Sequence, residues 1–281
     1  MQKINPIYLT EDDVKKLLPN EVGRGSDGMV FKYNKEYLIK LYHNKLRFMK
    51  SKITDVNILK TFFYEPITYY DEENVKLRSS SAIDMTINRQ KEVKRTHLPK
   101  APVYINNRFS GYLIKRLSGV QIHKLSGMPL MYKKAIIEEV LKSVDELFKN
   151  YIYHIDLANS PITKSLHINS RGEIESVGHS NILVNPLTLR TNIIDLDGKS
   201  TVYTEQKSEA YERKSMYGFC VLILEFLFNI DFEEYEENIE ELFNLLEKKG
   251  IFKEFIEPLG CCELDIEQAK NFVKTIGKKQ Y

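Results

Sequence analysis

The sequence predicts an α+β fold with a small β-rich N-terminal part and a larger α-helical C-terminal part. Short β-type runs separated by turn residues occupy much of the first part, and from residue 131 the apolar residues follow a helical period. A further helix, apolar on nearly every side, is expected over residues 209–228. Strands that come first and helices that follow, without regular alternation, are typical of the α+β class.

The composition is that of an ordinary globular protein with a sizeable core: 281 residues, 42% hydrophobic and 28% charged. The 41 basic and 39 acidic residues leave a formal net charge of +2, which predicts no general attraction to nucleic acid or to a membrane surface. No apolar run approaches the roughly 20 residues that cross a bilayer, and the N-terminal segment lacks the apolar core of a signal peptide. We therefore expect a cytoplasmic protein with neither nucleic acid nor membrane as partner.

The cysteines agree with a reducing compartment. Cys220, Cys261 and Cys262 cannot all pair within one chain, and the two adjacent thiols are poorly placed for an ordinary bridge. We expect all three cysteines to be reduced and to serve as small apolar side chains.

The N-terminal part contains a predicted short helix before Pro19 and two predicted strand pairs. The first pair is a hairpin of residues 29–33 and 37–42, which a turn dipeptide joins. The second pair consists of residues 101–105 and 109–114. The long segment between the two pairs permits several helical fragments.

The C-terminal part begins with an amphipathic helix, because the apolar residues between 136 and 148 form one helical stripe. Two strand-like runs follow at residues 181–184 and 191–194. Residues 209–228 predict a central buried helix, and residues 233–277 predict two further amphipathic helices.

A glycine-rich loop precedes the first hairpin. Gly23, Gly25 and Gly28, followed by Val30, can form a phosphate cradle, since glycines let backbone N–H groups approach an anion closely. The β-type residues that follow argue against a dinucleotide-binding loop, which needs a helix there, and no Gly-Lys-Ser/Thr ends the motif as in a P-loop. A hairpin turn without a ligand is the alternative.

Lys40 lies twelve residues after the loop, inside an apolar run. A lysine in such a strand either extends its amine to solvent or meets an anion. The preceding glycine loop favours the anion, because a phosphate held there needs a nearby cation.

The glycine loop and the strand that ends at Lys40 resemble the nucleotide loop and lysine strand of the protein kinase-like superfamily. The resemblance implies that Lys40 binds the α- and β-phosphates of ATP. Residues 111–119 resemble the hinge of that family, with Ile114 beside the adenine and backbone groups around Arg116 meeting the base. On these residues alone, an edge strand with a polar exit is an equally good interpretation.

Two later segments resemble the family's catalytic motifs. His154, Ile155 and Asp156 are similar to His-Arg-Asp, with isoleucine in place of the arginine. The runs around Asn181 and Asp195 are similar to the end of the catalytic loop and to the metal motif. The resemblance implies that Asp156 is the catalytic base and that Asn181 and Asp195 hold Mg²⁺.

The spacing of these motifs departs from the family pattern. Asp156 precedes Asn181 by 25 residues, whereas the base of the family precedes its asparagine by five. Either an insertion of roughly residues 158–178 splits the loop, or Ser176 occupies the base position and no carboxylate base exists. We prefer the insertion. The acidic partner of Lys40 also stays open among three candidates, Asp55, Glu65 and Glu92.

By resemblance, then, the chain is an ATP- and Mg²⁺-dependent phosphotransferase with a bilobal kinase-like fold. Residues 1–117 would form the N-lobe and residues 118–281 the C-lobe. A divergent bacterial or phage-type Ser/Thr protein kinase, with a protein as substrate, is the first hypothesis. The alternatives are a small-molecule kinase of the aminoglycoside or choline type and a nucleotide-binding pseudokinase that acts as an interaction module.

Overall fold

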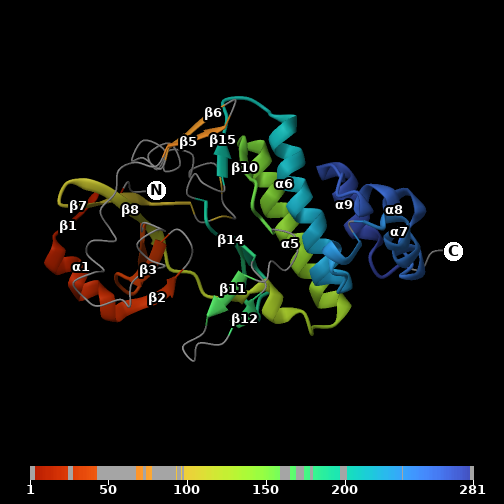
Figure 1. The fold of residues 1–281 in the computed structure, drawn as a ribbon, viewed down its shortest axis with the longest axis horizontal. Coiled ribbons are helices and arrows are strands. Elements are labelled where there is room, and N and C mark those ends of the chain that lie inside the picture. The colour runs from red at the N-terminus through yellow and green to blue at the C-terminus, as the bar shows by residue number, and fades with distance from the viewer. Residues whose placement is uncertain are drawn as a thin grey trace. The chain divides into compact units, whose positions relative to one another are not determined.

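The protein has an α+β fold with a mixed β-sheet and several helices (Figure 1). The chain divides into two compact units, residues 1–117 with 196–199 and residues 118–195 with 200–281. The computed structural model describes residues 4–24, 28–42, 68–71, 74–77, 93, 96, 98–158, 165–168, 174–177, 180–196, 201–235 and 237–278. Among these residues, no helix combines the length and the apolar character that a bilayer span requires.

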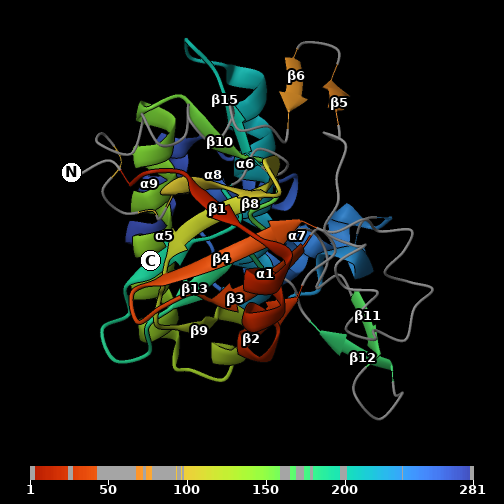
Figure 2. The same ribbon diagram turned by 90° about the vertical axis from the view of Figure 1, so that its left-hand side faces the viewer.

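A six-stranded sheet organises the first unit, in the order β1-β7-β8-β4-β3-β2 (Figure 2). β1 runs parallel to β7, and the other neighbours pair antiparallel, so both predicted strand pairs are confirmed. The strands are β1 (Ile7–Leu9), β2 (Glu21–Arg24), β3 (Gly28–Lys32), β4 (Tyr37–Tyr42), β7 (Ala101–Ile105) and β8 (Arg108–Lys115), and a separate hairpin pairs β5 (Thr68–Asp71) with β6 (Asn74–Leu77).

One face of this sheet is the core of the first unit, and helix α1 (Glu11–Leu17) packs there. Thr10 begins the helix with a capping box, in which its side chain accepts from the backbone N–H of Asp13, and η1 (Leu18–Asn20) follows at Pro19. Because side chains alternate along a strand, Ile39 and Leu41 enter the core while Lys40 belongs to the opposite face. The buried cluster comprises Leu9, Val14, Leu17, Met29, Phe31, Ile39, Leu41, Ala101, Val103, Ile105 and Leu113.

The second unit is built around two long helical segments, and both were expected. α5 (Leu130–Lys149) buries the predicted apolar stripe, and α6 (Glu209–Leu222) continues into a π-helical turn, η3 (Ile223–Leu227). The two predicted strand-like runs are present as β13 and β14, which pair antiparallel. The short elements are β9 (Val120–Gln121), η2 (Ile122–Leu125), β10 (Ile152–His154), β11 (Ser165–Ile168), β12 (Ile174–Val177), β13 (Ile182–Val184), β14 (Thr191–Ile193) and β15 (Thr201–Tyr203).

The C-terminal segment forms three α-helices, so the prediction of two was wrong. η4 (Phe232–Tyr235) precedes α7 (Ile239–Lys248), α8 (Lys253–Gly260) and α9 (Ile266–Thr275). Gly250 has φ of +76°, a left-handed conformation that ends α7. The extra helix, α8, is only eight residues long, too short for its period to be distinguished from that of its neighbours.

Candidate functional site

The residues predicted to bind a nucleotide in the first unit lie on adjacent strands. Val30 of β3 is opposite Lys40 of β4, and Lys40 is opposite Tyr112 of β8. In the next row, Leu38 is opposite Ile114. Cross-strand partners share a face, so these residues form one surface on the side of the sheet away from α1.

This surface combines a cation with half-buried apolar side chains. Lys40 is only 9% exposed, and its Nζ lies 5.8 Å from the ring centroid of Tyr112. The side chains of Val30, Leu38 and Ile114 are half-buried. Such a mixture suits a ligand with a flat apolar part and an anionic part.

Of the two described glycines of the loop, the packing of the strands requires only Gly28 to be glycine. A Cβ at Gly28 would lie 2.4 Å from the backbone oxygen of Leu41, so the packing of β3 on β4 already requires glycine there. At Gly23 nothing lies within 4 Å of the added atom, and its φ is not positive. The fold therefore does not require glycine at position 23, and close approach of a ligand remains a reason for it. Gly25 lies outside the described residues.

The end of β8, where the hinge was expected, is basic. Arg116 is exposed, and its backbone N–H donates to the carbonyl of Glu36 at 2.6 Å. Burial and the nearby Lys115 lower the pKa of Lys100. Because its N–H is already engaged, the backbone group of Arg116 that remains to meet a nucleobase is its carbonyl.

His154 joins the two candidate catalytic segments of the second unit. Its ring is fully buried at the end of β10, where Nδ1 accepts from the backbone N–H of Asp156 at 3.2 Å. The proton must then be on Nε2, which donates to the carbonyl of Ile194 at 2.9 Å. One side chain thus positions the backbone at Asp156 and the backbone immediately before Asp195.

Asn181 is held against Asp156 despite the long interval between them. Its Nδ2 donates to the carbonyl of Asp156 at 2.6 Å, and its backbone N–H donates to Leu157 at 3.1 Å. Because Nδ2 is the donor, Oδ1 is the atom of this buried amide that stays available to a cation. The isolated bridge between Ala158 and Ser180 closes the two ends of the interval.

Asp195 follows β14 in a left-handed conformation with φ of +64°. Its neighbour Ile194 donates to the carbonyl of Asn181 at 2.8 Å, and Thr201 Oγ1 donates to the carbonyl of Asp195 at 3.4 Å. Aspartate tolerates this conformation better than most residues do. The change of direction after Ile194 is thus specified by the backbone on both sides of the carboxylate.

Helix α6 supports the same segment through Gly218. A Cβ there would lie 3.0 Å from the carbonyl oxygen of Ala158 and 3.4 Å from Cβ of Leu157. Sequence reasoning had not assigned His154 and Gly218 a positioning role. A polar residue within a short buried strand, and a glycine inside a buried helix, were the signals that could have indicated it.

The structure therefore gathers Val30, Lys40 and Ile114 within the first unit, and Asp156, Asn181 and the backbone before Asp195 within the second. Ser176 lies in the β11–β12 hairpin, paired with Leu166. The three candidate acidic partners of Lys40, namely Asp55, Glu65 and Glu92, lie outside the described residues.

Asn181 and Asp195 supply oxygen donors, the ligand type that Mg²⁺ prefers in sites where substrate phosphates complete the coordination. In the described part of the chain, no group of three or more His, Cys, Asp or Glu is arranged to hold a metal ion by itself. No known protein family matches the sequence, and comparison with curated proteins finds no match.

Proposed function

We propose that this chain is an ATP- and Mg²⁺-dependent phosphotransferase with a bilobal kinase-like fold, and that its first-choice acceptor is a serine or threonine hydroxyl of a protein. The observation that carries the proposal is the 2.6 Å hydrogen bond from Asn181 Nδ2 to the carbonyl of Asp156. It joins the proposed base to the proposed metal asparagine across a 25-residue interval, and so supports the insertion hypothesis over the Ser176 alternative.

In this proposal each residue has one task. Asp156 accepts the proton of the acceptor hydroxyl, and Asn181 and Asp195 hold Mg²⁺ through oxygen atoms. Lys40 provides the cation for the α- and β-phosphates, while Val30 and Ile114 contact the adenine. ATP supplies the γ-phosphoryl group, and Mg²⁺ neutralises its charge. His154 and Gly218 keep the catalytic backbone in place.

The donor set fits Mg²⁺ because Asn181 commits its amide nitrogen to Asp156 and keeps Oδ1 for a cation. The neutral amide of Asn181 and the carboxylate of Asp195 provide only a small part of the coordination that Mg²⁺ needs. Sites of this kind depend on substrate phosphate for further ligands, which predicts that Mg²⁺ binds weakly without the nucleotide.

A small-molecule acceptor is the second candidate, favoured by the short interval between Asp195 and helix α6. Only 13 residues separate Asp195 from Glu209, where the helix begins. Three of them form β15, which pairs with β10. A long phosphorylation-controlled loop has no room in this interval.

The first experiment measures nucleotide binding by thermal shift with ATP, with and without Mg²⁺. We expect ATP with Mg²⁺ to raise the melting temperature of the wild type. Lys40→Met and Asp195→Asn should reduce this shift. Glu254→Gln, an exposed acid in the first turn of α8, is the control that should keep it.

The second experiment follows transfer of the γ-phosphate to the chain itself, to a generic protein substrate, and to aminoglycoside and choline acceptors. Asp156→Asn should abolish transfer but keep ATP binding, since the base is not a nucleotide ligand. Mg²⁺-dependent binding without transfer to any acceptor would refute the enzyme and leave the pseudokinase. Transfer that is unaffected by Asp156→Asn would refute the assignment of the base.

A further inference from the structure

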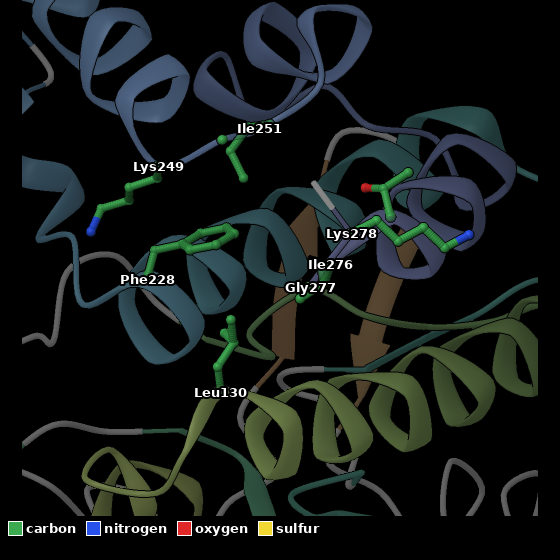
Figure 3. A pocket seen from close by; sticks show the side chains of 9 residues that line it. Leu130, Phe228, Lys249, Ile251, Ile276, Gly277 and Lys278 are labelled. Atoms are coloured by element: carbon green, nitrogen blue, oxygen red, sulfur yellow. The ribbon is translucent and has the colours of Figure 1, made fainter. Parts of the chain in front are cut away.

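The second unit has a pocket whose lining includes none of the residues of the proposed active site; Figure 3 shows the pocket. Its volume is about 380 Å³, and it is lined where α7 and α9 end and α5 begins. Gly250 and Gly277, with φ of +76° and +82°, follow α7 and α9 on its wall. The lining residues are Leu130, Phe228, Lys249, Gly250, Ile251, Thr275, Ile276, Gly277 and Lys278.

The pocket has an apolar interior and a basic rim. Leu130, Phe228 and Ile251 point toward one another across it, whereas Lys249 and Lys278 extend to opposite sides (Figure 3). Leu130 is 42% exposed, and the adjoining Met131 is 63% exposed, so the apolar surface continues along the start of α5.

Both rim lysines carry uncompensated charge. Lys249 and Lys278 are exposed, and neither forms an ion pair with another described residue. Two copies of this pocket would repel each other if they met face to face, because like charges would be brought together. The occupant that the rim favours is therefore an acidic segment with apolar side chains.

The same unit carries such a segment. Residues 231–241 contain seven acidic residues and no basic residue, and they include the half-buried side chains of Tyr235 and Ile239. Glu234, Glu237 and Glu240 are exposed. Within the described residues none of these three carboxylates pairs with a lysine or arginine, so their negative charges are available to a cationic partner.

We propose that the pocket takes the acidic segment, residues 231–241, of a second copy of this chain. Lys249 and Lys278 would pair with the glutamates of that copy, and its exposed Tyr235 and Ile239 atoms would face Leu130 and Phe228. The contact joins two different surfaces, so a two-fold dimer would make it twice and an open arrangement would make it once per copy. The proposal does not depend on phosphotransfer activity.

The test is the molar mass of the full chain in solution, measured by sedimentation velocity across a concentration series. We expect reversible association at low ionic strength that weakens as salt rises, because exposed charges are screened within about 10 Å at 0.1 M salt. Lys249→Glu with Lys278→Glu should lower the association constant roughly tenfold or more, and Glu234→Lys with Glu237→Lys should do the same.

Mixing the two charge-reversed variants distinguishes loss of the proposed contact from misfolding of a variant. Each charge-reversed variant should be monomeric alone, because its pocket rim and its segment then carry charges of the same sign. A mixture of the two variants should associate again, because the pocket of one variant and the segment of the other carry opposite charges. A synthetic peptide of residues 230–242 should compete with wild-type association and should not bind the Lys249→Glu, Lys278→Glu variant. Lys35→Glu with Lys124→Glu changes the net charge equally at exposed sites elsewhere and should associate like the wild type.

A wild type that stays monomeric at low salt and high micromolar concentration would overturn the proposal. Association that survives both charge reversals, or a mixture that stays monomeric, would overturn it equally. Nucleotide binding measured on the same variants is expected to be unchanged, so failure here is distinguishable from failure of the proposed enzymatic function.

Discussion

Replacing Asn181 with alanine tests the bond that links the two candidate catalytic segments. The amide of Asn181 is 3% exposed and donates to the carbonyl of Asp156 at 2.6 Å. Alanine removes the donor and leaves the carbonyl without this partner, while the backbone bonds of position 181 to Leu157 and Ile194 are retained. The substitution therefore isolates the side-chain contribution.

The expected loss follows from the burial of the bond. A lost hydrogen bond contributes about 0.5–1.5 kcal/mol, and a buried acceptor left unsatisfied adds about 1–3 kcal/mol. Since Asp156 is only partly buried, water recovers part of the second amount, and we expect Asn181→Ala to lower the free energy of unfolding by about 2–3 kcal/mol. For a chain of 281 residues this corresponds to a melting temperature lower by about 3–5 °C.

Asn181→Asp sharpens the test, because the carboxylate has the same shape as the amide but no donor. Burial and the facing carbonyl oxygen would raise the pKa of the new carboxyl in the folded state. A raised folded-state pKa leaves stability intact below the unfolded value of about 3.9, and stability is lost as the pH rises through the folded value. Asn181→Asp should thus be closer to the wild type at pH 5 than at pH 8.

Urea denaturation at both pH values measures these differences. Asn271→Ala, at an exposed position of α9, is the matched control and should change stability by less than about 0.5 kcal/mol. The hydrogen bond is refuted if Asn181→Ala changes the free energy of unfolding no more than this control does, or if the stability of Asn181→Asp does not depend on pH. The proposed function would then lose the observation on which it mainly rests.

Three further substitutions test the second unit. Gly218→Val should lower stability by about 2 kcal/mol or more, because its Cβ would meet the backbone of Ala158 at 3.0 Å; circular dichroism melts measure this, and an unchanged melt contradicts the packing. Burial lowers the pKa of Lys133, so stability should rise with pH toward the ordinary lysine value; Lys133→Met should remove that slope in urea titrations. Burial opposes ionisation of Asp145, but its bonds to Lys149 and Lys270 outweigh this and lower its pKa. Asp145→Asn should therefore cost about 1 kcal/mol at neutral pH, and the difference should vanish as the pH falls below about 4.

The elements that the sequence predicted well are those with a strong local pattern. The alternating residues around Lys40 and the turn before Tyr37 specify the β3–β4 hairpin by short-range interactions alone. The apolar stripe of α5 is equally local. In the C-terminal segment the prediction of two helices was wrong, because α8 has only eight residues, and the left-handed conformation at Gly250 that ends α7 leaves no periodic pattern in the sequence.

The candidate site shows the same division between local and tertiary information. The sequence by itself placed Lys40 in an apolar strand and named Asp156, Asn181 and Asp195 through motif resemblance. It left the 25-residue interval between Asp156 and Asn181 open to two interpretations. Only the tertiary structure decided that Asp156 and Asn181 meet, because a hydrogen bond between distant residues depends on the loop being closed by other contacts. The buried ring of His154 bonds to both segments, and glycine at position 218 lets helix α6 approach Ala158 closely. These distances depend on residues far apart in the sequence, so no local residue pattern predicts them.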